Sequence, residues 1–365
     1  MPKKLPVKSL IGVVLLALVG VAGWSSWTWW QWAIAPAAVS APNTPPRSAN
    51  LRVAPGTSAQ AIGQDLETLG LIRSAQAWNL WARWLLLQNT NGGFQAGTYQ
   101  ISATQTLPDI AQQIWTGAVA ETTFTIPEGW SIREMATYFE QQGYFTAEEF
   151  LTAVNTFSTA EYPWLPTTKP IEGYPRLEGY LFPDTYQLPL DTSIQPTTII
   201  RLMLNRFEQV ALPIYQRLAG KSKLTLAEFI TLASIVEREA VVPTERSRIA
   251  GVFYNRLRQS MPLGSDPTVE YAFGIKQTPD RPLTFAQVEQ PSPYNTYVTP
   301  GLPPAPIASP GKLSLEATAN PENTDYLYFV ARYDGTHVFS RTLQEHQAAQ
   351  TTIHDQRDAA QKNAQ

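Results

Sequence analysis

The hydrophobic pattern of the chain begins with one long uninterrupted run. From Leu10 onward the residues are apolar or small, and no charged residue occurs between Lys8 and Arg47. Crossing a bilayer takes about 20 such residues. Tryptophans, whose amphipathic rings favour the membrane interface, crowd the far end of the run: Trp24, Trp27, Trp29, Trp30 and Trp32. The pattern predicts a cytoplasmic stub and single transmembrane anchor over residues 1–36.

The flanks of this run predict its orientation. Lys3, Lys4 and Lys8 precede it, and positive residues stay on the cytoplasmic side, which places the remainder of the chain in the periplasm. A cleaved signal peptide is the alternative, because Ala33-Ile34-Ala35 has the small-x-small pattern of a cleavage site. Residues 37–50 are rich in Pro, Ala and Ser, and we interpret them as a linker.

A strand-turn-helix pattern then occurs twice, about 73 residues apart. The two copies are LRVAPGTSAQAIGQDLETLGLI and TFTIPEGWSIREMATYFEQQGYF, and each has a Ser suited to cap the helix, Ser58 and Ser131. Apolar helix positions and the glycines recur in register: Gly56 with Gly129, Ile62 with Met135, Leu66 with Phe139, and Gly70 with Gly143. The repeat is either a chance recurrence of a common layout or the mark of a small sugar-binding module of the LysM kind.

Further elements follow from periodicity and turn residues. A strand is expected at FQAGTYQI, a Pro-, Gly- and Tyr-rich loop at 158–190, and a hairpin of DYLYFVARY with THVFS across Asp334-Gly335. Short strands and turns are expected around that hairpin, after residue 259. The helices are expected at 105–116, 196–219, 223–241 and 243–259. The mixture indicates an α+β fold.

Composition narrows the classes of function. Apolar residues make up 44% of the chain and charged residues 16%, which is ample for a core. The net charge is -3 with acids and bases interleaved, which argues against a nucleic-acid partner. There is no cysteine, and His337, His346 and His354 lack metal-ligand spacing. We therefore expect no metal and no cofactor, and without GxSxG a serine hydrolase is disfavoured.

The helix at 223–241 carries the carboxylates of greatest interest. Its apolar face consists of Phe229, Leu232, Ala233, Val236 and Ala240. Glu237 lies on one margin of that face and Glu239 on the other. Partial burial would raise the pKa of either carboxyl and suit it to donate a proton. The helical wheel does not choose between them, and a solvated Glu paired with a neighbouring Arg is the simpler interpretation.

Two later segments add polar candidates. Asp266 precedes Pro267 and is most simply a helix N-cap with proline at the first helical position. Asn295 and Thr296, in the segment YNTY, are equally suited to form a turn.

Five blocks, taken together, resemble the motif set of the endolytic murein transglycosylases of the YceG-like family. In chain order they are LEGYLFPDTY, LASIVEREA, LGSDPTVEYAFG, SPYNTYVTPGLPPAPIASPG and THVFSRTLQEH. The resemblance extends from about Leu51 to about His346. It implies a LysM-like subdomain over residues 51–121 and an α+β catalytic domain over 122–365 that includes a helical, acid-bearing segment.

The resemblance also implies an activity. Such enzymes cleave the β-1,4 bond between N-acetylmuramic acid and N-acetylglucosamine inside nascent peptidoglycan strands, leaving 1,6-anhydro ends and terminating elongation. The implied partners are glycan strands, the inner membrane and peptidoglycan synthases. A muramidase that uses water, or a non-catalytic glycan-binding scaffold of cell-wall synthesis, would fit the anchor and repeat equally well.

The implied catalytic acid lies in the SIVERE block. Aligned with the Ile-x-x-x-Glu signature of soluble lytic transglycosylases, the Glu falls on Glu239, and Glu237 is the second choice. One carboxyl suffices for such a reaction, because the substrate's acetamido group and 6-hydroxyl replace the second carboxylate of ordinary glycosidases. Asn295, Tyr297, Tyr271 and Asp266 are candidates to bind the substrate.

Overall fold

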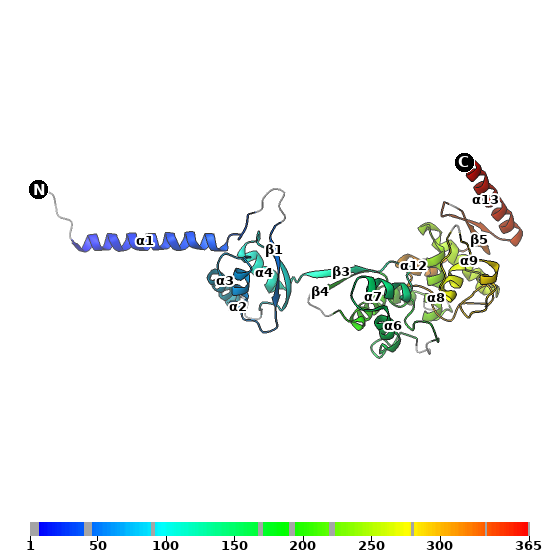
Figure 1. Ribbon diagram of the computed structural model, residues 1–365, viewed down its shortest axis with the longest axis horizontal. Helices are drawn as coiled ribbons and strands as arrows, with labels where there is room; N and C mark the ends of the chain where they lie inside the picture. The colour runs from blue at the N-terminus through cyan, green and yellow to red at the C-terminus, as the bar shows by residue number, and fades with distance from the viewer. Residues whose placement is uncertain are drawn as a thin grey trace. The chain divides into compact units, whose positions relative to one another are not determined.

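The computed structural model describes residues 7–39, 46–88, 92–166, 171–189, 194–218, 223–278, 281–332 and 334–363. Helices and two-stranded sheets alternate along them, which confirms the predicted α+β class (Figure 1). The chain separates into two compact units, Met1–Thr123 with Gln187–Ser193, and Phe124–Tyr186 with Ile194–Gln365.

The first unit is built on an antiparallel pair of strands. β1 (Ser48–Val53) pairs with β2 (Gly97–Ser102) so that Leu51 faces Tyr99. Between the strands run α2 (Ala59–Thr68) and α3 (Ala75–Gln88), and α4 (Leu107–Thr116) follows β2. The strand predicted at FQAGTYQI and the helix predicted at 105–116 are therefore confirmed. The buried core of this unit includes Leu51, Ile62, Leu66, Trp78, Tyr99 and Ile101.

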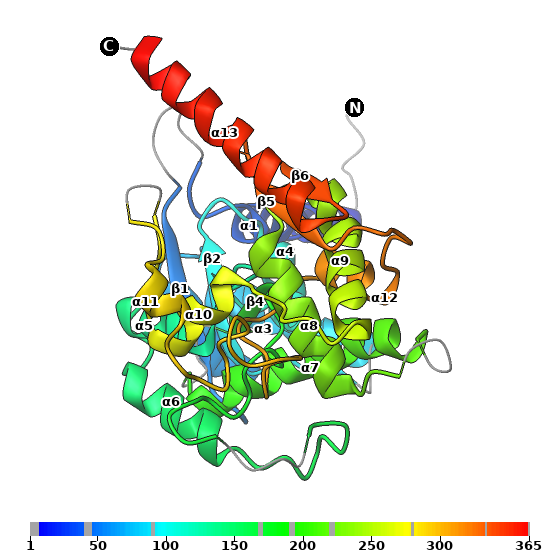
Figure 2. The same cartoon turned by 90° about the vertical axis from the view of Figure 1, so that its right-hand side faces the viewer.

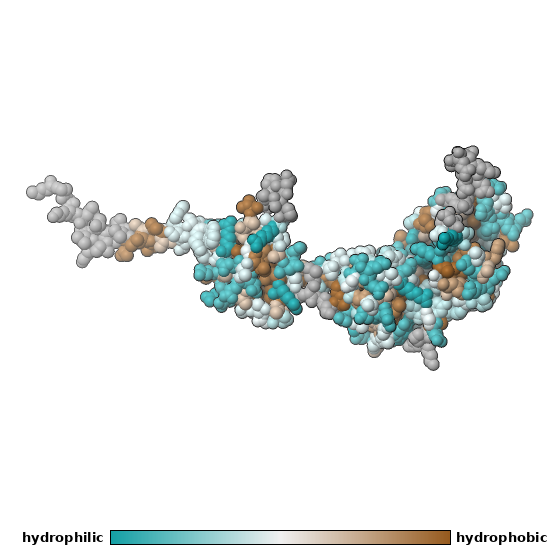
Figure 3. Space-filling model, in the orientation of Figure 1, coloured by the Kyte–Doolittle hydropathy of each residue, from teal (hydrophilic) through white to brown (hydrophobic). Residues whose placement is uncertain are grey.

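The N-terminal run forms one helix, α1 (Val7–Ile34). Its last turns pack onto the first unit: Ala33 is fully buried, Trp30 stacks on Trp81 of α3, and the Arg73 side chain donates to the Trp32 carbonyl. Earlier aliphatic residues of α1 are exposed and form the brown stretch of Figure 3. Among the residues that the structure describes, no helix is both long and apolar enough to cross a membrane.

The second copy of the strand-turn-helix pattern has the predicted layout. β3 (Glu121–Thr125) leads through a turn to α5 (Ile132–Gln141), just as β1 leads to α2. Gly56 and Gly129 both take positive φ, 82° and 78°, a conformation that other residues rarely adopt. α6 (Ala147–Thr156) follows, and β3 pairs with β4 (Thr185–Pro189), a strand inside the segment that we had interpreted wholly as loop.

Helices dominate the second unit. α7 (Pro196–Gln216) and α8 (Leu226–Glu239) lie where the sequence predicts, and the next predicted helix divides into η1 (Pro243–Glu245) and α9 (Arg246–Arg258). α8 is the central element, because every residue from Phe229 to Val236 is buried. α12 (Lys312–Ala319) packs against α7, α8 and α9. The core around α8 includes Leu232, Ile235, Val236, Ile249, Phe253 and Tyr294.

The C-terminal part departs from the expected succession of turns and short strands. The predicted hairpin is present: β5 (Tyr328–Ala331) pairs antiparallel with β6 (His337–Ser340), and both contact α13 (Leu343–Asn363) (Figure 2). However, α11 (Phe285–Val288), α12 and α13 are helices, and α10 (Asp266–Phe273) begins where Asp266-Pro267 indicates a helix start. α11 and α12 are too short, and α13 too polar, for a clear apolar period, so that periodicity does not reveal them.

Candidate functional site

The two candidate carboxylates of α8 occupy different environments. Glu237 is a buried ion-pair partner whose side chain is only 6% exposed. Its Oε1 accepts a hydrogen bond from Arg246 at 3.3 Å, and its Oε2 accepts one from the backbone N–H of Gly311 at 2.9 Å. Both oxygens of Glu237 are thus committed to holding α8, α9 and the start of α12 together.

Glu239, the last residue of α8, has one neutral donor instead. The Ser265 hydroxyl donates to Glu239 Oε1 at 2.6 Å. The pKa of Glu239 is raised to about 7, chiefly by burial of the carboxyl; the nearby Asp266 also raises it, while the Ser265 hydroxyl and Arg256 oppose the shift. A carboxyl with this pKa exchanges a proton readily at neutral pH.

The Ser265 hydroxyl is available to Glu239 because it makes no capping hydrogen bond to its own helix. The prediction that Asp266 is the N-cap is wrong by one position. Ser265 is the N-cap of α10, Asp266 is the first helical residue, and Pro267 is the second. The Ser265 side chain accepts no cap hydrogen bond and points to Glu239 instead. Pro267 removes one N–H that would otherwise need a partner, which lowers the demand for a side-chain cap.

Asp266 lies close enough to act electrostatically on Glu239, and it has hydrogen-bond partners of its own. Its Oδ1 accepts from the Tyr297 hydroxyl at 2.6 Å, and its Oδ2 accepts from the Gln277 side chain at 3.2 Å. Burial raises the pKa of the Tyr297 hydroxyl well above its ordinary value, so Tyr297 remains a donor. The structure therefore brings together three of the residues singled out from the sequence: Glu239, Asp266 and Tyr297.

Arg256 of α9 is a charged residue of this site that we did not predict. Its guanidinium donates to the carbonyls of Leu263 and Leu327, at 2.5 and 2.6 Å, and packs over the ring of Tyr328. Burial lowers the pKa of Arg256, and Glu239 acts in the opposite direction. No sequence signal identified either Arg256 or Ser265, because both reach Glu239 only through tertiary packing.

The side chains of Asn295 and Tyr271 form hydrogen bonds with groups other than Glu239. The Asn295 amide donates to the carbonyls of Val288 and Gln290, both at 2.8 Å, and its oxygen accepts from the Tyr297 N–H. This arrangement favours the turn-forming alternative for Asn295. The Tyr271 hydroxyl donates to Glu178 at 2.9 Å.

Glu178 is a second carboxyl with a raised pKa. It is 1% exposed, and burial raises its pKa to about 7, although hydrogen bonds from Tyr271 and the Ile132 N–H oppose the shift. Around it the rings of Tyr174, Tyr271 and Tyr294 stack on one another. Through Tyr271, Glu178 anchors α10. Each of its two carboxyl oxygens already accepts a hydrogen bond, one from Ile132 and one from Tyr271.

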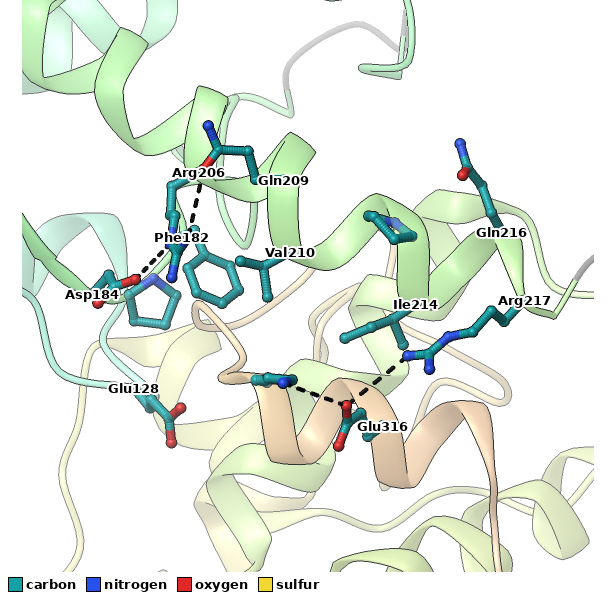
Figure 4. A pocket seen from close by; sticks show the side chains of 13 residues that line it. Glu128, Phe182, Asp184, Arg206, Gln209, Val210, Ile214, Gln216, Arg217 and Glu316 are labelled. Atoms are coloured by element: carbon teal, nitrogen blue, oxygen red, sulfur yellow. Dashed lines mark hydrogen bonds and ion pairs between the residues drawn. The ribbon is translucent and has the colours of Figure 1, made fainter.

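Two cavities of the second unit bear on the site. One, of about 780 Å³, lies between α7, α12 and the segment at Phe182–Asp184, and Figure 4 shows its charged groups largely paired: Arg206 with Asp184, and Arg217 and Lys312 with Glu316. It does not include Glu239. The other, of about 250 Å³, is lined by Arg238 and Pro267, the chain neighbours of Glu239 and Asp266.

Within the described residues, no cluster of His, Asp or Glu is arranged to hold a metal ion. The chemistry that the site can perform with its own side chains is proton transfer by Glu239, with Ser265, Asp266 and Arg256 setting its proton affinity. A half-buried carboxyl whose pKa lies near neutral pH is typical of an acid–base enzyme.

Comparison with known proteins identifies the family to which the chain belongs. A family model described as YceG-like matches residues 51–352, and the chain belongs to that family. It is 35% identical to the endolytic murein transglycosylase of Bacillus subtilis (strain 168), over 82% of this chain and 83% of the relative. It is 34% identical to the enzyme of the same name from Streptococcus pneumoniae D39, over 80% of this chain but 55% of that protein.

A solved structure is similar as well. The crystal structure of a yceG-like protein from Listeria monocytogenes aligns with 84% of this chain and all of the other, with a TM-score of 0.58 and 32% identity. The family resemblance inferred from five sequence blocks is therefore confirmed.

Proposed function

We propose that this protein is an endolytic murein transglycosylase that uses Glu239 as its single catalytic acid and base. The observation that carries the proposal is the Glu239 carboxyl, whose pKa of about 7 lets it hold a proton and release it at neutral pH. The names of the relatives from Bacillus and Streptococcus agree with this chemistry.

In the proposed reaction Glu239 first donates its proton to the glycosidic oxygen between N-acetylmuramic acid and N-acetylglucosamine. That C–O bond breaks as the substrate's own acetamido oxygen bonds to the anomeric carbon. The Glu239 carboxylate then removes the proton from the 6-hydroxyl of the same sugar, whose oxygen attacks the anomeric carbon and displaces the acetamido oxygen. The product is a 1,6-anhydro end, and Glu239 recovers its proton. Attack within one sugar avoids recruiting a second molecule.

Glu237 is less suited to this role. Its two oxygens already accept hydrogen bonds from the buried Arg246 and from a backbone N–H, so neither is free to present to a sugar. The Ser265 hydroxyl occupies only one oxygen of Glu239 and can donate to either protonation state.

We assign supporting roles to the neighbours. Asp266 and Tyr297 are proposed to bind sugar hydroxyls beside the acid, and Arg256 is proposed to stabilise Glu239 when it becomes a carboxylate. Asn295 and Tyr271 are proposed to act on the substrate only indirectly, by holding the YNTY turn and α10 in place.

The remaining parts of the chain would bring this site to its substrate. We propose that residues 1–36 anchor the protein in the inner membrane and that 37–50 link the anchor to a LysM-like glycan-binding subdomain at 51–121. The catalytic domain, 122–365, would then act in the periplasm beside peptidoglycan synthases and terminate glycan elongation. The charge-free run with its tryptophan-rich end supports the anchor, and the β1-α2-α3-β2 order supports the glycan-binding subdomain.

The test is digestion of purified sacculi followed by mass analysis of the products. The wild-type protein should release fragments with anhydro ends, Glu239→Gln should release almost none, and Glu237→Gln should retain the activity of the folded protein. Products heavier by one water would instead identify a muramidase. Normal anhydro products from Glu239→Gln would refute the proposed acid.

A further inference from the structure

We propose that the cavity of about 250 Å³ lined by Arg238 and Pro267 binds a free carboxylate of the peptide that substitutes the glycan. The inference rests on the proposed function, because it presumes a murein substrate. Arg238 and Pro267, the chain neighbours of Glu239 and Asp266, line the cavity together with Arg133 and Lys276, whereas Glu239 and Asp266 themselves do not.

The charges of the cavity favour an anion. Its lining contains three cations, Arg133, Arg238 and Lys276, against two carboxylates, Glu134 and Glu270. Arg238 is already neutralised by Glu270 at 3.1 Å. The Glu134 carboxylate is committed to the start of α5, where its Oε2 accepts from the N–H and the hydroxyl of Ser131.

The other two cations are the ones available to a ligand. Neither Arg133 nor Lys276 has an ion-pair partner among the residues described, and both side chains are exposed. The Arg133 guanidinium is held over the rings of Tyr174 and Tyr271, and one of its nitrogens donates to the Gly173 carbonyl. A guanidinium oriented in this way retains further N–H groups that match a carboxylate.

Nearby acids do not cancel this charge. Glu178 interacts electrostatically with Arg133, but its pKa of about 7 leaves it partly neutral at physiological pH, and its oxygens already accept hydrogen bonds from Ile132 and Tyr271. The cavity therefore keeps a net positive character.

The size of the cavity indicates what part of the substrate it takes. Pockets for whole small molecules measure about 300 to 1,000 Å³. About 250 Å³ is too small for a disaccharide but sufficient for an acidic amino-acid side group. In murein such groups belong to the stem peptide, which is attached to the sugar on one side of the scissile bond.

The test compares two substrates with the full-length protein: glycan strands that carry stem peptides, and the same strands stripped of peptide by an amidase. The wild-type protein should cleave the peptide-bearing strands with the higher kcat/KM. Arg133→Gln should lower that value about tenfold, the effect of losing a hydrogen bond to a charged group. Lys276→Gln, at a more exposed position, should lower it about twofold to fivefold. Neither variant should change cleavage of stripped strands.

Two controls keep the result interpretable. Arg133→Lys keeps the positive charge and should restore part of the preference, while unchanged cleavage of stripped strands by Arg133→Gln excludes a purely structural role over the tyrosine rings. Lys223→Gln, at an exposed lysine outside the cavity, should change neither substrate. Equal effects of Lys276→Gln on both substrates, or no effect on either, would overturn the inference. A wild-type protein that cleaves neither strand would instead refute the proposed function.

Discussion

Glu237 and Glu239 are two residues apart at the end of the same helix, yet they face opposite sides of α8 with opposite consequences. On the Glu237 side, Arg246 and the Gly311 N–H each donate a hydrogen bond to one carboxylate oxygen. On the Glu239 side, burial and the nearby Asp266 disfavour the negative charge of the carboxylate, and a single serine hydroxyl offsets them only in part. The difference shows that a carboxyl becomes suited to acid–base chemistry when its surroundings lack the cations and hydrogen-bond donors that would stabilise its negative charge.

The largest contrast is expected in catalysis. Glu239→Gln keeps an oxygen that can accept from Ser265 but has no proton to transfer, so the rate should fall by about 10³-fold, a typical contribution of general acid–base catalysis. Release of anhydro-ended fragments from sacculi measures it. A variant that is no less stable than wild type in thermal unfolding would show that the loss is chemical, whereas a rate within tenfold of wild type would contradict the role of Glu239.

The reverse contrast is expected in stability. Glu237→Gln leaves the Arg246 guanidinium, 10% exposed, without its countercharge. Removing one partner of a buried ion pair costs about 3 kcal/mol or more, so the free energy of unfolding should drop by roughly that amount in urea titrations. Activity per folded molecule should persist. A variant as stable as wild type would mean that the pair contributes little to the fold.

Two substitutions around Glu239 should move its pKa in opposite directions. Ser265→Ala removes a hydrogen bond that lowers this pKa, so the pH at which kcat/KM declines should rise by about one unit. Asp266→Asn removes a like charge, so the same midpoint should fall. Tyr297→Phe is the matched control, since it breaks the hydrogen bond to Asp266 without removing the charge. Shifts in the same direction for both variants would disprove this electrostatic account.

The smallest effect concerns the pH dependence of stability. The pKa of Glu239 is about 7 in the folded protein against 4.5 for an ordinary Glu, so the folded state binds the proton more tightly. The resulting stabilisation is complete below pH 4.5 and is lost as the pH rises through about 7. Glu239→Gln should therefore be about 1 kcal/mol more stable than wild type at pH 8 and no different at pH 4.5. Glu178, present in both proteins, does not affect the difference.

Local sequence patterns predicted much of the fold. The capped starts of α2 and α5, the long amphipathic helices α7 and α8, and the Asp334-Gly335 hairpin all carry short-range signals. β4 carried no such signal, because it lies in a segment whose prolines and glycines suggest a loop. Of the helices after residue 259, only the start of α10 was indicated, by Asp266-Pro267. The others, α11, α12 and α13, were missed because tertiary contacts, rather than an apolar period, stabilise them.

For the site, the sequence reduced the candidates to Glu237 and Glu239 but could not separate them. The separation depends on Arg246, Gly311 and Ser265, which lie 9 to 74 residues away along the chain and meet α8 only in the folded protein. The role of Ser265 was also not predictable from the start of α10, because Asp266-Pro267 looks like the cap. No local pattern indicates that the hydroxyl of the true N-cap, Ser265, donates to a carboxylate instead.

The central claim is that Glu239 exchanges its proton near neutral pH, and titration of its carboxyl carbon by ¹³C NMR tests it most directly. The resonance is assigned by its loss in Glu239→Gln, which distinguishes it from Glu178. The account predicts a midpoint of about 7 for Glu239. A midpoint near 4.5, the value of an ordinary solvated Glu, would contradict it.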